Sequence, residues 1–296
     1  MDTQHLQAFL AIAETGSFSS AAQRLHLTQP AVSKRIAILE EQLNTSLFDR
    51  IGRQVSLTQA GLSLLPTARN ILQEVAAAQR AIADLKGDVR GKLSIATSHH
   101  IGLHRLPPYL RDYSRSYPEV KLDLHFLDSE QAFHEIIQGR FDLAVITLAE
   151  EMDSRIAADV IWRDQLRFVA APTHPLATAE RLSLMDLTPY QAIMPDMNTY
   201  TTRLIRTLFD QQQQALDITM VTNHLDTIKM MVAIGLGWGV LPETMIDGEL
   251  RVLPVQHPPL TRPLGCIYHR QRSLNNAARA FLELLKRDGL HNTTNV

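Results

Sequence analysis

The segment from Ser98 to His104 contains one serine and three histidines, residue types that can bind a metal or catalyse a reaction. His100 and His104 are four residues apart, a spacing that places both rings on one face of a helix and that occurs in zinc sites. Ser98 beside His99 also suggests a nucleophile with its base. No nearby cysteine or acidic residue completes a ligand set, and no Gly-x-Ser-x-Gly motif surrounds Ser98. We therefore expect no metal, no cofactor and no catalytic residue here.

Polar residues recur at the ends of strand-like runs between residues 92 and 225. Ligands of open α/β sheets lie beyond the carboxyl ends of the strands, and helix N-termini favour anions. We therefore predict that a small, anionic or strongly polar effector binds there, with these candidates: Thr97, Ser98, His99, His100, Ser129, Thr147, Asn198, Thr199, Tyr200, Asn223 and His224. Asp128 also follows such a run, next to Ser129. The alternative is that these residues merely cap helices, which Ser, Thr and Asn do well.

A second candidate site lies near the N-terminus, in residues 17–43. Ser17 and Thr28 are predicted to cap two helices joined by a tight turn, with Pro30 in the first turn of the second helix. One face of that helix is an apolar stripe with Gln29 at its edge, and the opposite face is small, polar and positive: Pro30, Ser33, Lys34 and Ala37. Small residues permit close approach to the major groove, while Gln, Ser and Lys contact bases or phosphate. The stretch therefore predicts a DNA-binding helix-turn-helix.

The segment after this helix is typical of a hairpin wing. Residues 51–54 form a turn between two short extended runs, with Arg53 near the tip. A wing beside a DNA-contacting helix usually lies along the backbone or in the minor groove, where arginine is favoured. An exposed loop cation is the alternative for Arg53.

Residues 58–86 have the pattern of a long helix with a heptad seam. The seam contains Leu65, Ala68, Leu72, Val75, Gln79 and Ile82. The helix would be roughly 40 Å long, at 1.5 Å per residue. So small an N-terminal domain cannot bury this seam, so we expect a second copy of the chain to cover it. A polar hinge follows at residues 86–91.

From residue 92 the pattern changes to alternating strands and helices, which indicates βαβ units and mostly parallel sheets. The strand-like runs fall into two groups, on either side of residue 164. A further strand near 262–270 and a closing helix at 275–287 complete the pattern. We therefore predict two α/β lobes with two crossings between them.

The composition limits the number of domains and the expected location of the protein but does not indicate its function. A chain of 296 residues is long enough for two or three domains, and the net charge of −2 argues neither for nor against DNA binding. Cys266 is the only cysteine, so an internal disulfide is impossible. The N-terminus lacks the basic region of a signal peptide, and no window reaches the ~18 apolar residues that a membrane span requires. We expect a cytoplasmic protein that does not bind membranes.

The first 65 residues closely resemble the N-terminal domain of LysR-type transcriptional regulators, through FLAIAETGSFSSAAQRLHLTQPAVSKRIAILEEQLNTSLFDRIGRQVSLTQAG. Weaker matches follow in the right order: GRFDLAVI, HPLA, GLGWGVLP, and the final strand and helix. The resemblance implies a winged helix-turn-helix and a long linker helix that dimerises. It also implies a two-lobed α/β effector domain like a periplasmic binding protein, so the fold class is a multi-domain α+β protein.

The resemblance also implies specific boundaries and contacts. The domains would be residues 1–58 for DNA binding, 59–91 for the linker helix and hinge, 92–163 with 265–296 for lobe one, and 164–264 for lobe two. Family members contact DNA at the positions of Gln29, Pro30, Ser33, Lys34 and Arg53. We add Thr28 and Arg35, although Arg35 replaces a residue that is more often uncharged.

We therefore expect a transcriptional regulator, and no enzyme. It would bind double-stranded DNA at a partly palindromic site as a homodimer, or more usually a homotetramer, respond to a small-molecule effector and contact RNA polymerase. Two alternatives remain: an enzyme or carrier built from the α/β portion, and an architectural DNA-binding protein without an effector. Turnover without DNA would favour the former alternative, and indifference to metabolites and to DNA sequence the latter.

Overall fold

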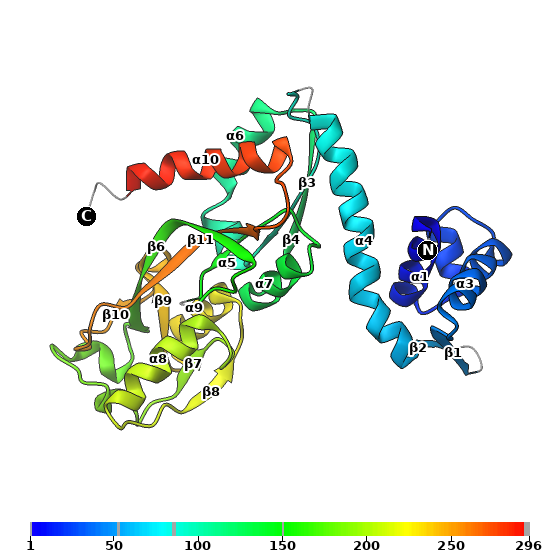
Figure 1. The fold of residues 1–296 in the computed structure, drawn as a ribbon. Helices are drawn as coiled ribbons and strands as arrows, with labels where there is room; N and C mark the ends of the chain where they lie inside the picture. Colours follow the sequence, from blue (N-terminus) through cyan, green and yellow to red (C-terminus); the bar gives the residue numbers. More distant parts are fainter. Residues whose placement is uncertain (1, 52–53, 85–86, 150, 293–296) are drawn as a thin grey trace. The chain divides into compact units, whose positions relative to one another are not determined.

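The computed structural model describes residues 2–51, 54–84, 87–149 and 151–292. The chain forms two compact units, of which the first consists mainly of residues 1–86 and the second mainly of residues 87–296. The ribbon in Figure 1 gives the elements of each. Each unit is described separately below.

The N-terminal unit is a helical bundle followed by a hairpin and a long helix. Its elements are α1 (Thr3–Thr15), α2 (Phe18–Arg24), α3 (Gln29–Leu43), β1 (Phe48–Ile51), β2 (Gln54–Leu57) and α4 (Gln59–Asp84). Gly16 ends α1 in a left-handed conformation, with φ of 63°. Ser17 caps α2 by accepting a hydrogen bond from the Ser20 amide at 3.3 Å. The predicted helix-turn-helix is confirmed, and β1 and β2 pair in an antiparallel hairpin.

The core of this unit forms where α1, α2 and α3 meet. Phe9 and Ile12 of α1 and Val32, Ile36 and Leu39 of α3 are fully buried. The apolar stripe predicted for the second helix therefore faces the core. Burying a side chain of this size contributes about 1.5–3 kcal/mol, so the stripe fixes which face of α3 remains outside.

The long helix α4 uses only part of its apolar seam within this unit. Ala68 is fully buried, and Leu65 and Leu72 pack against the same core. Further along the helix, Val75 is 38% exposed and Ile82 is 69% exposed. The distal part of the seam thus lacks a partner among the described residues.

The C-terminal unit is built on a mixed sheet, whose nine strands among the described residues include β10 (Arg251–Val252) at the side of β6. The strand order is β4-β3-β5-β11-β6-β9-β7-β8. Its other strands are β3 (Gly91–Thr97), β4 (Val120–Phe126), β5 (Leu143–Thr147), β6 (Ile156–Ala170), β7 (Ala192–Met194), β8 (Ile218–Val221), β9 (Trp238–Pro242) and β11 (Thr261–His269). Pairing is parallel within β4-β3-β5 and within β9-β7-β8, and antiparallel wherever β6 or β11 takes part.

Helices cover both faces of this sheet, in two groups that we call lobe one and lobe two. Lobe one contains β3, β4 and β5 with α5 (His99–His104), α6 (Pro107–Ser116), α7 (Ser129–Ile137) and α10 (Asn276–Asn292). Lobe two contains β7, β8 and β9 with α8 (Tyr200–Gln211) and α9 (Leu225–Ala233). Each lobe has a separate hydrophobic core on each face of its strands.

The two lobes are joined by β6 and β11, which lie side by side in the middle of the sheet (Figure 1). Along β6, Trp162 packs in a core of lobe one and Leu166 in a core of lobe two. Along β11, Leu264 belongs to lobe one, whereas Leu260, just before the strand, belongs to lobe two. The chain therefore passes from one core to the other between residues 162 and 166, and returns between residues 260 and 264.

Among the described residues, no helix combines the length and the apolar character that crossing a membrane requires.

Candidate functional site

The outer face of α3 presents its polar residues at the N-terminus of the helix. Thr28 accepts a hydrogen bond from the Ala31 amide at 3.4 Å and so caps the helix. The next two residues, Gln29 and Pro30, are exposed, as is Lys34, while Ser33 is half-buried. This face suits a major groove, because its polar groups project from the first turns of the helix without bulky neighbours.

Two contacts hold side chains on this face. The Arg35 guanidinium donates to Gln4 Oε1 of α1 at 2.8 Å, so Arg35 is half-buried and partly engaged within the protein. The Ser19 hydroxyl lies 3.5 Å from Gln29 Oε1, which brings an exposed residue of α2 to the same surface. Ser19 is not among the residues predicted from the sequence to contact DNA. The predicted wing contact, Arg53, lies outside the described residues.

A carboxylate connects α3 to the hairpin. Glu40 Oε1 accepts hydrogen bonds from the backbone amides of Leu47 at 2.7 Å and Phe48 at 3.4 Å. Both amide-bearing residues are buried, so these bonds fix where the hairpin begins relative to α3. From sequence, Glu40 was only an acidic residue at the far end of the helix.

A cavity of about 60 Å³ lies between the two lobes of the C-terminal unit. Its lining residues come from both lobes and from the crossing strand β11: Ser98, His99, His100, Asp128, Ser129, Glu130, Thr147, Pro195, Thr199, Tyr200, Thr201, Asn223, Leu225 and Arg262. Most of them stand at the carboxyl ends of β3, β4, β5, β7 and β8. The geometry of parallel strands thus gathers these distant segments at one edge.

Most residues predicted from sequence to bind an effector line this cavity, but three do not. The Thr97 side chain is fully buried and its hydroxyl donates to the Val145 carbonyl at 2.9 Å, which ties β3 to β5. Asn198 is exposed outside the lining. His224 is also exposed, and its ring lies edge-on to His99 with 4.4 Å between ring centroids.

Several lining residues already have partners inside the protein. Ser129 Oγ accepts from the Thr147 amide at 3.2 Å, and Thr199 Oγ1 caps α8 by accepting from the Thr202 amide at 3.3 Å. Asn223 Oδ1 accepts from the Asp196 amide at 2.8 Å. Capping and ligand binding are thus not exclusive here, because each oxygen can accept more than one hydrogen bond.

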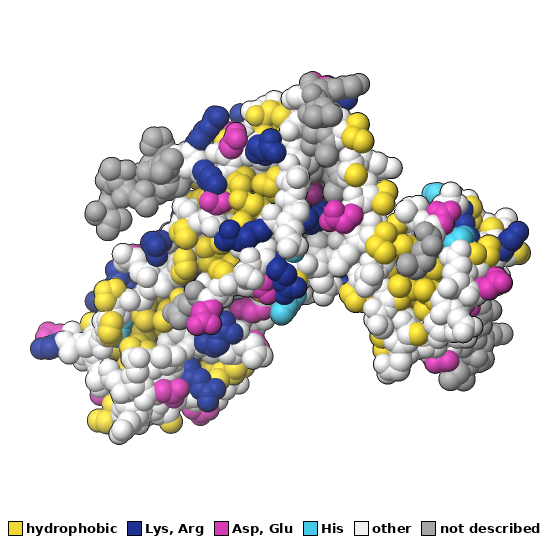
Figure 2. All heavy atoms as spheres, viewed as in Figure 1, with side chains coloured by type: hydrophobic (Ala, Val, Ile, Leu, Met, Phe, Trp, Pro, Cys, Tyr) yellow, Lys and Arg dark blue, Asp and Glu magenta, His cyan; other side chains and the backbone are white. Residues whose placement is uncertain are grey.

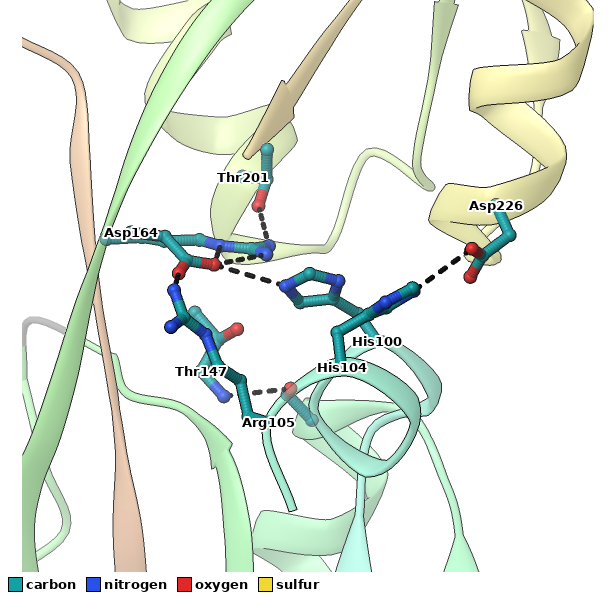
Figure 3. Close-up of polar contacts among 9 residues, drawn as sticks. His100, His104, Arg105, Thr147, Asp164, Thr201 and Asp226 are labelled. Carbon is teal, nitrogen blue, oxygen red and sulfur yellow. Dashed lines mark hydrogen bonds and ion pairs between the residues drawn. The ribbon is translucent and has the colours of Figure 1, made fainter. Parts of the chain in front are cut away.

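Contacts across the cleft join lobe one to lobe two. The Asn223 side-chain amide donates to Asp128 Oδ2 at 2.8 Å, and the Tyr200 backbone amide donates to Glu130 Oε1 at 3.1 Å. His104 Nε2 lies 3.1 Å from Asp226 Oδ1 (Figure 3). Together these contacts hold the lobes in the arrangement that the structure shows.

A charged cluster lies where the crossing strands meet α5 (Figure 3), and two of its members, His100 and Arg262, line the cavity. Asp164 of β6 is its centre and has no exposed surface. Its carboxylate accepts from Arg105 at 2.6 Å, from Arg262 at 3.1 Å and from His100 at 3.2 Å. Arg262 also donates to the Thr201 hydroxyl of α8 at 3.1 Å. The two guanidinium groups exceed the single carboxylate by one positive charge.

Burial and neighbouring charges together lower the pKa values of Asp164 and His100 below their ordinary values. Burial would raise the pKa of Asp164, but the hydrogen bond from His100 and the charges of Arg262 and Arg105 outweigh it and lower this pKa below its ordinary value. Burial lowers the pKa of His100 below 6.5, against the opposing effect of Asp164. At neutral pH, Asp164 is therefore ionised and His100 is neutral.

Of the residues in this cluster, only His100 was predicted from the sequence as a site residue. Arg262 stands at the start of an apolar strand and Asp164 alternates with apolar residues in β6, so each has the local pattern of an exposed strand residue. Glu130 was not predicted as a site residue either. Its only signal in the sequence is its place directly after Ser129, in the first turn of a helix. No local signal could have shown that Asp164 and Arg262 meet, or that Glu130 reaches Tyr200.

The sequence of this chain matches known family models over both of its units. Residues 3–62 match the family described as bacterial regulatory helix-turn-helix protein, lysR family, and residues 86–289 match the LysR substrate binding domain. The chain belongs to the LysR family. A LysR-type regulator is a DNA-binding transcriptional regulator with an effector-binding domain, and the family consists of non-enzymes. The expectation of a regulator is thereby confirmed.

Individual relatives of this LysR-type regulator are also named as transcriptional regulators. It is 30% identical to the HTH-type transcriptional activator CmpR of Synechocystis sp., over 94% of this chain and 93% of that protein. It is 65% identical over 108 residues to an HTH-type transcriptional regulator of Azotobacter vinelandii, covering 36% of this chain and 75% of that protein. The structure of full-length CbnR in complex with its target DNA matches with a TM-score of 0.68 at 22% identity, over 97% of this chain and 99% of that one. The last likeness confirms the fold.

Proposed function

We propose that this LysR-type regulator binds a partly palindromic promoter site as a homodimer or homotetramer, and that a small polar or anionic effector in the interlobe cleft modulates this binding. The observation that carries the proposal is the cavity at the carboxyl ends of five strands, whose walls come from both lobes. A ligand in such a cavity contacts both lobes at once, so its binding free energy depends on how the lobes are arranged.

On the DNA side, the proposed contacts are Thr28, Gln29, Pro30, Ser33, Lys34 and Arg35, with Arg53 of the wing. Gln29 and Lys34 support this assignment most strongly, because they are exposed on the first turns of α3. Arg35 is assigned to a phosphate, since its guanidinium already donates to Gln4. Lys34 makes no ion pair with any of the described residues, so it is available to DNA.

The proposed dimer forms through α4. Its seam changes from buried at Ala68 to 69% exposed at Ile82, a pattern that a second copy of the helix would complete. A two-fold dimer would present two α3 helices to two half-sites. We also propose the domain boundaries given above, a cytoplasmic location and contact with RNA polymerase. These further proposals are based on membership of the LysR family. One member of that family, CbnR, was crystallised with its target DNA.

On the effector side, the proposed ligand contacts are Ser98, His99, His100, Ser129, Thr147, Thr199, Tyr200 and Asn223 in the cavity wall, with Thr97, Asn198 and His224 adjacent to it. Arg262 lines the cavity and favours an anion, while the carboxylates of Asp128 and Glu130 in the same lining each accept a hydrogen bond from lobe two. Charged side chains of both signs are interspersed on the face of this unit seen in Figure 2.

The test combines duplex binding with calorimetry. Genomic mapping of bound sites supplies the specific duplex, and a metabolite panel is titrated into the full chain with and without that duplex. A metabolite that binds and changes the affinity for specific DNA supports the proposal. Ser98→Ala should weaken that metabolite's binding, whereas unchanged affinity would remove Ser98 from the site. Specific DNA binding that no metabolite changes would contradict effector control.

A further inference from the structure

A carboxylate of the protein itself occupies the N-terminus of α8 inside the cleft. Glu130 Oε1 of lobe one accepts a hydrogen bond from the backbone amide of Tyr200, the first residue of this 12-residue helix, at 3.1 Å. The first amides of a helix have no partner within the helix and carry partial positive charge, so they attract anions. Glu130 therefore stands where the carboxylate of a ligand would be most favourable.

A second carboxylate repeats the arrangement nearby. Asp128 of lobe one accepts from the side chain of Asn223, just before α9, at 2.8 Å. In both pairs lobe one supplies the anion and lobe two supplies the donor. The donors that a ligand would use to join the lobes are thus already engaged by the protein.

An independent observation, a buried acceptor without a partner, points to a ligand in this cavity. The His100 side chain is 4% exposed and lines the cavity, and its Nδ1 has no hydrogen-bond partner among the residues that the structure describes. Its Nε2 faces the ionised Asp164 and must donate to it, so Nδ1 of the neutral ring is an acceptor. A buried acceptor without a partner costs stability, and a ligand that carries a donor would satisfy it.

A larger cavity continues on the other side of Glu130. It measures about 180 Å³, shares Ser129, Glu130, Thr147 and Tyr200 with the first, and adds the apolar side chains of Phe133 and Ile146. Glu130 and Tyr200, which this hydrogen bond joins, thus belong to the lining that the two cavities share. Withdrawal of Glu130 would open the smaller, polar cavity to the larger one, where the body of a ligand would fit.

We propose that Glu130 is the resident anion of the cleft, which holds the lobes together when no effector is bound, and that the effector replaces it with a carboxylate of its own while offering a hydroxyl or amino donor to His100. This inference rests on the proposed function, since it assumes that the cleft is the effector site. Glu130 thereby selects ligands, because only an anion replaces the favourable charge at α8 that its departure removes.

The first experiment measures the distance between the lobes without any ligand. Spin labels on Arg115→Cys of α6 and Gln211→Cys of α8, both at exposed positions, report this distance by double electron–electron resonance in the full chain. Cys266 is buried and would not be labelled, and dilution with unlabelled protein removes signals between subunits. Glu130→Ala should lower the ratio of closed to open molecules on the order of tenfold, as expected for a lost hydrogen bond to a charged group.

Two variants serve as comparisons. Glu130→Gln keeps an acceptor for the Tyr200 amide but loses the charge, so it should give a smaller shift. Glu119→Ala, which removes an exposed carboxylate of lobe one outside the cleft, should leave the distance unchanged. If Glu130→Ala also leaves the distance unchanged, the resident anion does not hold the lobes and the proposal is overturned.

The second experiment refills the vacated site. Acetate added to the Glu130→Ala variant should restore the short distance, whereas sodium chloride at the same ionic strength should not. Glycolate, which adds a hydroxyl donor to acetate, should act at a lower concentration. Equal action of acetate and chloride would overturn the replacement of Glu130 by a carboxylate, and equal concentrations of glycolate and acetate would overturn the role given to His100.

Duplex binding measured in parallel separates this inference from the proposed function. Glu130→Ala should still bind the specific duplex, because Glu130 lies in the effector unit and not among the proposed DNA contacts. Failure of the unmodified chain to bind any specific duplex would refute the proposed function, whatever acetate does to the variant.

Discussion

Asp164 and Arg262 form an ion pair inside the protein, at the place where the two crossing strands pass between the lobes. The nitrogen-to-oxygen distance is 3.1 Å, and the side chains are 0% and 6% exposed. Asp164 lies on β6 and Arg262 on β11, directly opposite each other in the antiparallel register. Through Thr201 and His100 the pair reaches α8 of lobe two and α5 of lobe one. One carboxylate thus links both crossings to both walls of the cleft.

Replacing Asp164 with asparagine should destabilise the effector unit by about 3–5 kcal/mol, because it leaves the buried charge of Arg262 uncompensated. Urea unfolding followed by tryptophan fluorescence is the measurement, since Trp162 and Trp238 are both buried in this unit. Asp153→Asn breaks an exposed pair with Arg155 and should leave the midpoint nearly unchanged. Equal effects of the two substitutions would show that the buried pair is not structurally important.

The stability of the effector unit should fall as the pH decreases from 7.5 to 5. The pKa of His100 is lowered in the folded protein, so the unfolded chain binds the proton first. Its contribution is complete above about pH 6.5 and is lost as the pH falls toward the folded pKa, at no more than about 1.4 kcal/mol per pH unit for one proton. The pKa of Asp164 is also lowered, so its contribution is present above about pH 4 and is lost only in stronger acid.

The variant His100→Gln tests this assignment, because glutamine keeps a donor for Asp164 but does not titrate. Urea unfolding at a series of pH values should give a shallower dependence for His100→Gln than for the unmodified chain. The pKa of His174 is also lowered by burial, so part of the dependence should remain. Identical pH profiles would assign the whole effect to groups other than His100.

Lys34→Ala should weaken binding to the specific duplex by about 1–3 kcal/mol if Lys34 contacts a base. A loss that is equal for all sequences, with a salt dependence reduced by about one unit of slope, would assign Lys34 to a phosphate instead. Fluorescence anisotropy with specific and scrambled duplexes at several salt concentrations distinguishes the two. Lys121→Ala, an exposed lysine of the effector unit, is the control and should leave both affinities unchanged.

Substituting glutamate for Val75 and Ile82 together should lower the oligomeric state, because it places charges in the exposed part of the α4 seam. Sedimentation velocity on the full chain measures this directly. Glu74→Gln changes an exposed residue off the seam and should leave the oligomer intact. An unchanged sedimentation coefficient in the double variant would locate the dimer contact elsewhere.

Much of the fold was predictable because its signals are local. Gly16, Ser17 and Thr28 set helix ends through their own backbone and side-chain chemistry, and the structure places those ends within a residue of the prediction. The order of strands along the chain was predictable for the same reason. The length of β6, which runs from Ile156 to Ala170, was not predicted beyond its second half. Its first half lacks a regular alternation of exposed and buried residues and pairs with β11.

The sequence by itself determined the helix-turn-helix, the apolar face that α3 buries, and the two α/β lobes, since capping residues and hydrophobic spacing act over a few residues. Only the tertiary structure decided that Glu130 meets Tyr200, 70 residues away, and that Asp164 meets His100 and Arg262, at separations of 64 and 98 residues. Those pairs exist because two antiparallel crossings bring the lobes together. A charge in a strand carries no local sign of the partner that it will meet there.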